Sequence, residues 1–140
     1  MDDERYRKGL QVRREVLGAD YVDRQLATGG DAFGEPMQRL ATEFCWGTVW
    51  TRPQLTRRER SLMNLALLMA LGRGAEFRLH VRGALANGLT AEDIREAILH
   101  ATVYLGMPAG VEATRQAREV LEAEGVLPPA SAPGPAQPAR

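Results

Sequence analysis

The sequence predicts an all-α protein, a single-domain bundle of six to seven helices. Apolar residues recur at helical spacing through most of the chain, capping residues separate these stretches, and no segment of useful length alternates like a strand. With 140 residues, one domain can bury a core without disulfides. Residues 128–140 are almost entirely Pro, Ala, Ser and Gly, which predicts a disordered tail. The predicted domain therefore spans residues 1–127.

The N-terminal third predicts three helices. A thin apolar stripe runs from Asp3 to Leu17, and Gly18 is placed to end that helix. A short second helix is expected over Asp20 to Ala27, because a run of breaking residues follows it. Pro36 suits the first turn of a third helix, which continues toward Trp46.

A loop is expected over residues 47–55, since Pro53 disfavours helical geometry in the residue before it. Thr56-Arg57-Arg58-Glu59 is a capping box, in which the Thr side chain and the Glu carboxylate each bond the other's backbone. The helix that it starts is apolar nearly all round from Ser61 to Leu71. This pattern is typical of a helix in the middle of a bundle or at a subunit interface.

Three further helices complete the prediction. One runs from about Ala75 to Ala86 and stops at Asn87-Gly88. The next starts at a second capping box, formed by Thr90 and Asp93, and places His100 away from its apolar stripe, as a surface or interface residue. Pro108 starts the last, which ends at Gly125.

Composition excludes several classes of protein. Lys plus Arg and Asp plus Glu both number 18, so the zero net charge argues against a nucleic-acid binder. No apolar run approaches the ~18 residues of a membrane span, and the charged N-terminus does not resemble a signal peptide, so we expect a cytoplasmic protein. Cys45 is the single cysteine, which rules out an internal disulfide and a Cys-x-x-Cys motif. The chain also lacks a G-x-S-x-G nucleophile motif and a phosphate-binding glycine loop.

The candidate catalytic residues are Glu76 and His80. They are four residues apart, so on a helix they share one face and can touch the same small molecule. Gly83 and Ala84 fall near that face and are expected to leave room beside them. Two such side chains are short of the usual three ligands of a catalytic zinc, so we expect acid–base chemistry without a metal. On frequency alone, an i,i+4 pair is more often a surface ion pair than a catalytic one.

Four more residues are candidates for substrate binding. Trp46, Trp50 and Arg52 could form the wall and floor of a pocket, although each tryptophan alone is more often a core or interface residue. Arg73 lies on a glycine-flanked turn just before Glu76. Arginines are good bidentate ligands for carboxylates.

The stretch from Phe44 to Gly110 resembles the carboxymuconolactone decarboxylase family, as does YRKGLQVRREVLGADYVD near the N-terminus. The most specific pieces are Cys45-Trp46-Gly47, Trp50-Thr51-Arg52-Pro53 and residues 76–84. The family belongs to an all-α, alkylhydroperoxidase-like superfamily whose peroxide-reducing members use a Cys-x-x-Cys pair. That pair is missing here, with Glu76 in the place of its second cysteine.

The resemblance implies cofactor-independent decarboxylation of 4-carboxymuconolactone, a small dianionic lactone, to the β-ketoadipate enol-lactone of protocatechuate catabolism. His80 is then expected to donate the proton, with Glu76 orienting it or exchanging roles, while Arg52 and Arg73 bind carboxylates. Trp46 or Trp50 would cover the ring. A homo-oligomer, trimer or hexamer, is expected, with no metal and no cofactor. Two alternatives stay open: a related lactone or hydroperoxide enzyme with a reactive Cys45, or a non-catalytic helical assembly protein.

Overall fold

The computed structural model describes residues 2–130, and it confirms the predicted all-α class, since these residues contain no strand. The predicted tail lies outside the described residues from position 131 on. The described part forms seven α-helices and one π-helix, η1: α1 (Asp3–Leu17), α2 (Ala19–Thr28), α3 (Glu35–Leu40), η1 (Ala41–Val49), α4 (Arg57–Ala70), α5 (Gly74–Ala86), α6 (Ala91–Leu105) and α7 (Met107–Ala123).

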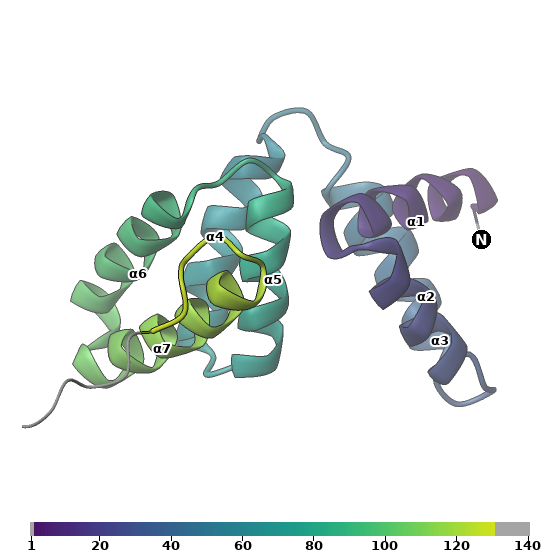
Figure 1. The fold of residues 1–140 in the computed structure, drawn as a ribbon. Helices are drawn as coiled ribbons and strands as arrows, with labels where there is room; N and C mark the ends of the chain where they lie inside the picture. The colour runs from purple at the N-terminus through teal and green to yellow at the C-terminus, as the bar shows by residue number, and fades with distance from the viewer. Residues whose placement is uncertain (1, 131–140) are drawn as a thin grey trace, which may run out of the picture.

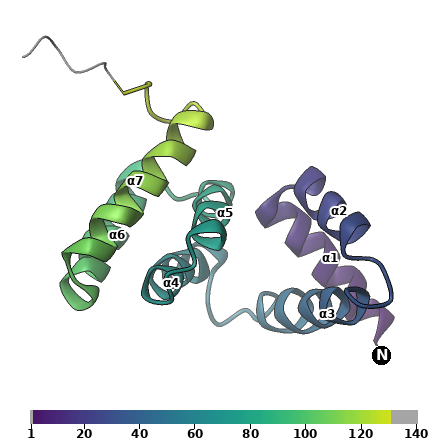
Figure 2. The ribbon, with the colours of Figure 1, turned by 90° about the horizontal axis from the view of Figure 1, so that it is seen from below.

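The helices form two groups, each around a core of its own. Figure 1 shows α4 to α7 together on one side and α1 to α3 on the other, joined by the loop after η1. Helices α4 to α7 enclose one apolar core, whereas α1, α2 and η1 enclose a second that includes Trp46 and Trp50. Helix α5 faces α1 in both views (Figures 1 and 2), and its Leu79 packs against the second core. The junction between the groups is therefore built on α5 and α1.

Both predicted capping boxes are present. The Thr56 hydroxyl accepts from the Glu59 amide at 3.1 Å, and the Glu59 carboxylate accepts from the Thr56 amide at 2.6 Å. Thr90 and Asp93 make the same pair of bonds at the start of α6. Caps of this kind contribute about 1 kcal/mol each, so the starts of α4 and α6 are well defined.

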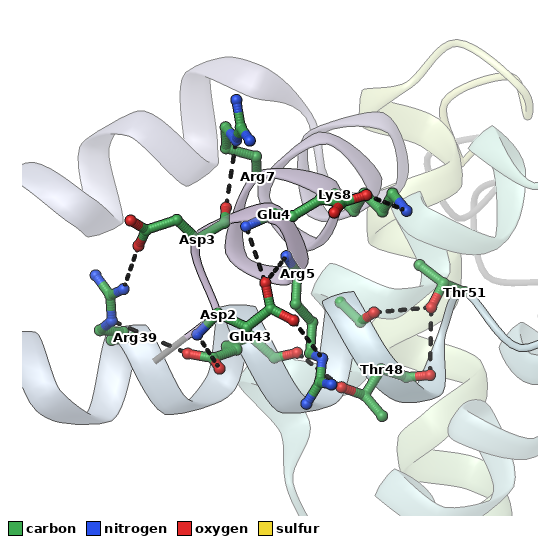
Figure 3. Close-up of polar contacts among 11 residues, drawn as sticks. Asp2, Asp3, Glu4, Arg5, Arg7, Lys8, Arg39, Glu43, Thr48 and Thr51 are labelled. Atoms are coloured by element: carbon green, nitrogen blue, oxygen red, sulfur yellow. Dashed lines mark hydrogen bonds and ion pairs between the residues drawn. The ribbon is translucent and has the colours of Figure 1, made fainter.

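Polar contacts fix the first turn of α1 to the neighbouring helices (Figure 3). The carboxylate of Asp3 pairs with Arg39 of α3 at 2.9 Å, and the Asp2 amide donates to Glu43 of η1 at 3.2 Å. Asp2 and Asp3 are exposed, whereas Arg39 and Glu43 are half-buried, so each contact adds modest stability and mainly sets the register of α1.

The helix beginning near Pro36 extends further than predicted and changes its winding. From Ala41 on it is a π-helix, and its last backbone bond joins the Trp50 amide to the Cys45 carbonyl at 2.9 Å. The helix therefore covers the first part of the expected loop. The Thr51 hydroxyl donates to the Gly47 carbonyl at 2.8 Å and closes this end (Figure 3). π-Helical segments are rare, and they are frequently found at functional sites.

The apolar helix α4 has one face in the core and another in solvent. Ser61, Leu65 and Met69 are buried, whereas Leu67 and Leu71 are exposed. The all-round apolar pattern thus reflects one buried face together with an exposed apolar face on the same helix.

Candidate active site

His80 lies at the junction of the two helix groups, where α5 meets the aromatic residues of η1. Its ring is stacked with Trp46, with ring centroids 6.3 Å apart and planes 3° from parallel. Trp50 lies 6.5 Å from the same ring, and the two indoles are 4.7 Å from each other. Both tryptophans are buried. The structure thus brings together three of the predicted site residues, with His80 far along the sequence from the two tryptophans.

Asn64 of α4 contacts one ring nitrogen of His80. Its amide nitrogen lies 3.4 Å from His80 Nδ1. An amide nitrogen can only donate, so this hydrogen bond requires the tautomer of the neutral ring in which Nδ1 accepts and Nε2 carries the proton. The bond is long and therefore weak, but it leaves Nε2 as the atom available to a ligand.

Burial lowers the pKa of His80, and the nearby Glu76 carboxylate opposes this shift. Desolvation disfavours the imidazolium ion, whereas an anion favours it. Burial is the larger effect here, so His80 is mainly neutral at pH 7 in the free protein. A ligand that brings negative charge to the ring will favour its protonation.

Glu76 is held by Arg73, with 2.5 Å between Arg73 Nη2 and Glu76 Oε1. This hydrogen bond lowers the pKa of Glu76, so the carboxylate is ionised at neutral pH and is a poor proton donor. Glu76 does act on His80 electrostatically, as its position one turn earlier predicts. Arg73 is more than half exposed, and none of its described contacts joins it to His80 or to the tryptophans.

Arg52 lies in the exposed loop two residues after Trp50. Its carbonyl accepts a hydrogen bond from Arg60 Nη2 at 3.1 Å, while its own guanidinium has no ion pair within residues 2–130. The Arg52 guanidinium is thus available to an anion, but it is exposed, and no described contact joins it to His80.

The prediction for Gly83 and Ala84 was wrong. A methyl group on Gly83 would lie 3.1 Å from Val16 Cγ1, so this glycine allows α1 to approach α5. Ala84 is fully buried in the core of the α4–α7 group. Small residues at these positions serve helix packing and leave no space for a ligand.

Three cavities of the described residues lie away from His80. One of about 430 Å³ lies between α6 and α7, and one of about 570 Å³ lies against α3 and η1. A third, of about 330 Å³, is lined by Arg73 together with residues of α4, α5 and α7. Arg73 therefore faces a cavity distinct from the aromatic pair. Among residues 2–130 there is also no group of three side chains suited to hold a metal ion, and no helix long and apolar enough to cross a membrane.

Sequence reasoning missed Asn64 as a site residue. A signal was present, because it is the only amide in the apolar run from Ser61 to Leu71. A polar side chain on a mostly apolar helix face needs a hydrogen-bond partner when it is buried. The identity of that partner depends on how α4 packs on α5, which the pattern of one helix cannot give.

Comparison with known proteins places this arrangement in a family. A sequence model described as the Carboxymuconolactone decarboxylase family matches residues 35–119, which include Trp46, Asn64 and His80. The chain belongs to the carboxymuconolactone decarboxylase family. Within this family it is 44% identical over 127 residues to 4-carboxymuconolactone decarboxylase of Acinetobacter baylyi, covering 91% of this chain and 94% of that protein. It is also 48% identical over 106 residues to nitrosuccinic acid decarboxylase of Metarhizium robertsii, covering 76% of this chain and 73% of the relative.

In this member of the carboxymuconolactone decarboxylase family, three kinds of side chain at the junction can act on a ligand. His80 can move a proton at Nε2, the indoles can cover a flat ligand, and Glu76 can adjust the protonation of the histidine. The Cys45 thiol is partly buried, and burial raises its pKa, which disfavours the reactive thiolate. The arrangement is therefore suited to proton transfer rather than to thiol chemistry.

Proposed function

We propose that this chain catalyses the cofactor-independent decarboxylation of 4-carboxymuconolactone to the β-ketoadipate enol-lactone. The similarity to the Acinetobacter enzyme, which extends over nearly the full length of both proteins, carries the choice of substrate. The position of His80 against the aromatic pair supports the same chemistry. A role in protocatechuate catabolism and a cytoplasmic location are parts of the same proposal.

The substrate supplies its own electron sink. Loss of CO2 leaves an electron pair on the ring carbon next to the ring oxygen, and the ring double bond conjugates this pair to the lactone carbonyl. The resulting extended enolate is then protonated at the carbon beside that carbonyl, which gives the enol-lactone. The protein has to bind two carboxylates, stabilise charge on the lactone oxygen and deliver one proton.

We assign proton donation to His80, with Glu76 as the residue that favours its protonated form. Glu76 is the weaker candidate for the acid, because Arg73 keeps its carboxylate ionised. Trp46 and Trp50 cover the lactone ring and exclude water. Arg52 remains a proposed carboxylate ligand, and Arg73 is proposed to act through Glu76, given that its own charge is paired.

The decisive experiment generates the lactone in situ and follows CO2 release and enol-lactone formation without added metal. We expect turnover by the wild-type protein and a loss of roughly 10² to 10⁴ in kcat for His80→Ala, with the protein still folded by circular dichroism. His100→Ala is the histidine control, with its mass in solution checked as well, because His100 is exposed on α6 and its ring contacts Tyr104. Near-full activity of His80→Ala would remove His80 from the mechanism, and an inactive wild type would refute the proposed substrate.

A second candidate substrate is nitrosuccinic acid, which the Metarhizium relative acts on by its name. This compound is also a small dicarboxylic acid with an electron-withdrawing group beside one carboxylate, so its carbanion is stabilised without a cofactor. The lower coverage of that relative favours the lactone. Measuring kcat/KM for both compounds on the same enzyme preparation decides between them.

One alternative function is disfavoured by a specific observation, and the activity assay tests the other. A hydroperoxide enzyme that uses Cys45 would need a thiolate, whereas burial raises the pKa of this thiol. Retained activity after alkylation of Cys45 would exclude that mechanism. A non-catalytic assembly protein would leave the lactone untouched under every condition.

We further propose that the chain works as a homo-oligomer, a trimer or hexamer. Large apolar side chains are exposed along α6 and α7, among them Val103, Tyr104 and Met107, which are each at least two-thirds exposed. Contiguous exposed apolar surface typically marks an interface. Light scattering should give a multiple of the 15.4 kDa chain mass, and Val103→Glu should reduce it. A monomer at micromolar concentration would contradict this.

A further inference from the structure

Arg60 on α4 differs from the arginines around it because it makes no ion pair within residues 2–130 and interacts with the neighbouring Glu59 only through its charge. On the same turn of the helix, Arg57 pairs with Glu15 at 2.7 Å and Arg58 pairs with Asp93 at 2.9 Å. Arg60 makes a single hydrogen bond within the described residues, from Nη2 to the Arg52 carbonyl. Its Nε is buried without a partner among residues 2–130. Arg60 as a whole is half-buried, so its charge is neither fully solvated nor paired with a carboxylate by an ion pair within residues 2–130.

The position of Arg60 points to the site of that anion. It precedes Asn64 by four residues, so the two side chains lie on the same face of α4, and Asn64 contacts His80. Its hydrogen bond to Arg52 fixes the guanidinium at the loop that follows Trp50. Arg60 thus lies one turn of α4 before the residue that contacts His80, and its hydrogen bond joins it to the loop after Trp50, so it lies at the edge of the junction.

We propose that Arg60 binds the carboxylate that the substrate retains, and thereby positions the lactone beside His80. The inference rests on the proposed function, which supplies a dianionic substrate. The retained carboxylate is the better ligand for Arg60, because tight binding of the departing carboxylate would be lost in the transition state and would slow the reaction. Arg60 Nη1 makes no hydrogen bond within residues 2–130 and its charge is in no ion pair there, whereas the charge of Arg73 is already paired with Glu76.

Arg13 is the other arginine whose Nε is buried without a partner among residues 2–130, and its contacts lie away from His80. It is only 7% exposed and donates to Thr42 Oγ1 at 3.0 Å, within the α1–η1 interface. Its titratable neighbours are Tyr21, Tyr6 and Cys45, and no described contact joins it to His80. Arg13 is therefore explained by packing between α1 and η1.

Steady-state kinetics on the full chain test the proposal. Arg60→Gln is compared with Arg58→Gln, which removes the same charge from the same helical turn. We expect KM for the lactone to rise roughly 10- to 100-fold in Arg60→Gln, the loss of a hydrogen bond to a charged group, with a smaller change in kcat. Arg58→Gln should leave KM within about twofold of the wild type, because surface pairs contribute little. Arg60→Lys, which keeps the charge but loses the bidentate geometry, should lie between them.

A second substrate separates binding from a purely structural role. This substrate is a lactone whose retained carboxylate has been converted to an amide. The wild type and Arg58→Gln should bind it much more weakly than they bind the parent lactone, whereas Arg60→Gln should bind the two compounds with similar affinity. Equal losses in all three proteins would overturn the proposal.

A binding measurement decides the matter independently of turnover. Trp46 and Trp50 are the only tryptophans, so their fluorescence reports a ligand at the aromatic pair. Adipate, an inert dicarboxylate, should quench this fluorescence in the wild type, with a Kd at least about tenfold higher in Arg60→Gln. An unchanged Kd in Arg60→Gln, or no response of the wild type to adipate, would overturn the role of Arg60 even if the protein decarboxylates the lactone. Conversely, a weakened Kd in a protein that is inactive on the lactone supports Arg60 and refutes the proposed substrate.

Discussion

Substituting Gly9 by alanine should destabilise the protein, although alanine is the better helix former. Gly9 lies at the closest approach of α1 to η1, where a Cβ would be 2.0 Å from the Thr42 carbonyl oxygen and 2.7 Å from the Gly47 nitrogen. Ordinary contacts begin near 3.4 Å, so the two helices would have to separate by about 1.4 Å. Both obstacles are backbone atoms, which cannot move aside as a side chain can.

The magnitude follows from two opposing effects. Replacing glycine by alanine inside a helix stabilises it by about 1 kcal/mol. Overpacking costs about 1–3 kcal/mol and more where no side chain can yield. Separation of α1 from η1 also stretches the 3.0 Å bond between Arg13 and Thr42, which leaves a buried guanidinium without its partner. We therefore expect a net loss of about 2 kcal/mol or more.

Gly83→Ala is the matched control for this prediction. The gain in helix propensity is the same, but the nearest atom to the new Cβ is the side-chain methyl Val16 Cγ1 at 3.1 Å, which can shift by a few tenths of an ångström. Urea unfolding followed by far-ultraviolet circular dichroism gives both free energies. We expect Gly83→Ala to lie within about 1 kcal/mol of the wild type. The reasoning fails if Gly9→Ala is as stable as Gly83→Ala.

Three further predictions concern the histidine and the helix caps. If protonated His80 is the acid, kcat/KM should fall as the pH rises through the lowered pKa of His80. Glu76→Gln should move this fall to lower pH, because the carboxylate that raises the pKa of His80 is gone. A fall at the same pH in both proteins would contradict the electrostatic effect of Glu76 on His80. Asn64→Asp should raise the pKa of His80, since it puts a carboxylate near Nδ1. Proton NMR can follow the titration of His80, and the exposed His100, the second of two histidines in the chain, serves as the internal reference. Thr90→Ala should lower the free energy of unfolding by about 1 kcal/mol in urea with kcat unchanged, and a change in kcat would show that the start of α6 affects the site.

The features set by local sequence were predicted correctly. The capping boxes at Thr56 and Thr90 define the starts of α4 and α6, because each box depends on residues only three apart. The same applies to Gly18, which ends α1 with φ +92°, a conformation that favours glycine. The i,i+4 relation of Glu76 and His80 also follows directly from helix geometry.

The features that depend on packing between helices were not predictable from one helix at a time. The winding of η1 is one example, since its residues fit an ordinary helix followed by a loop equally well. Gly83 is another, because a small residue on a polar helix face can admit either a ligand or a neighbouring helix. The contacts of Asn64 and Arg60 require α4, α5 and the loop after η1 to be placed together.

The electrostatics of the junction suggest that substrate binding itself prepares the proton donor. In the free protein, burial holds the pKa of His80 below its ordinary value, and Glu76 only partly compensates. A dianion placed against the ring adds negative charge in a site with little water, where the attraction to an imidazolium ion is stronger than in bulk solvent. His80 should therefore take up a proton as the substrate binds. Because kcat reports the enzyme–substrate complex and kcat/KM the free enzyme, the descending limb of kcat should lie at higher pH than that of kcat/KM.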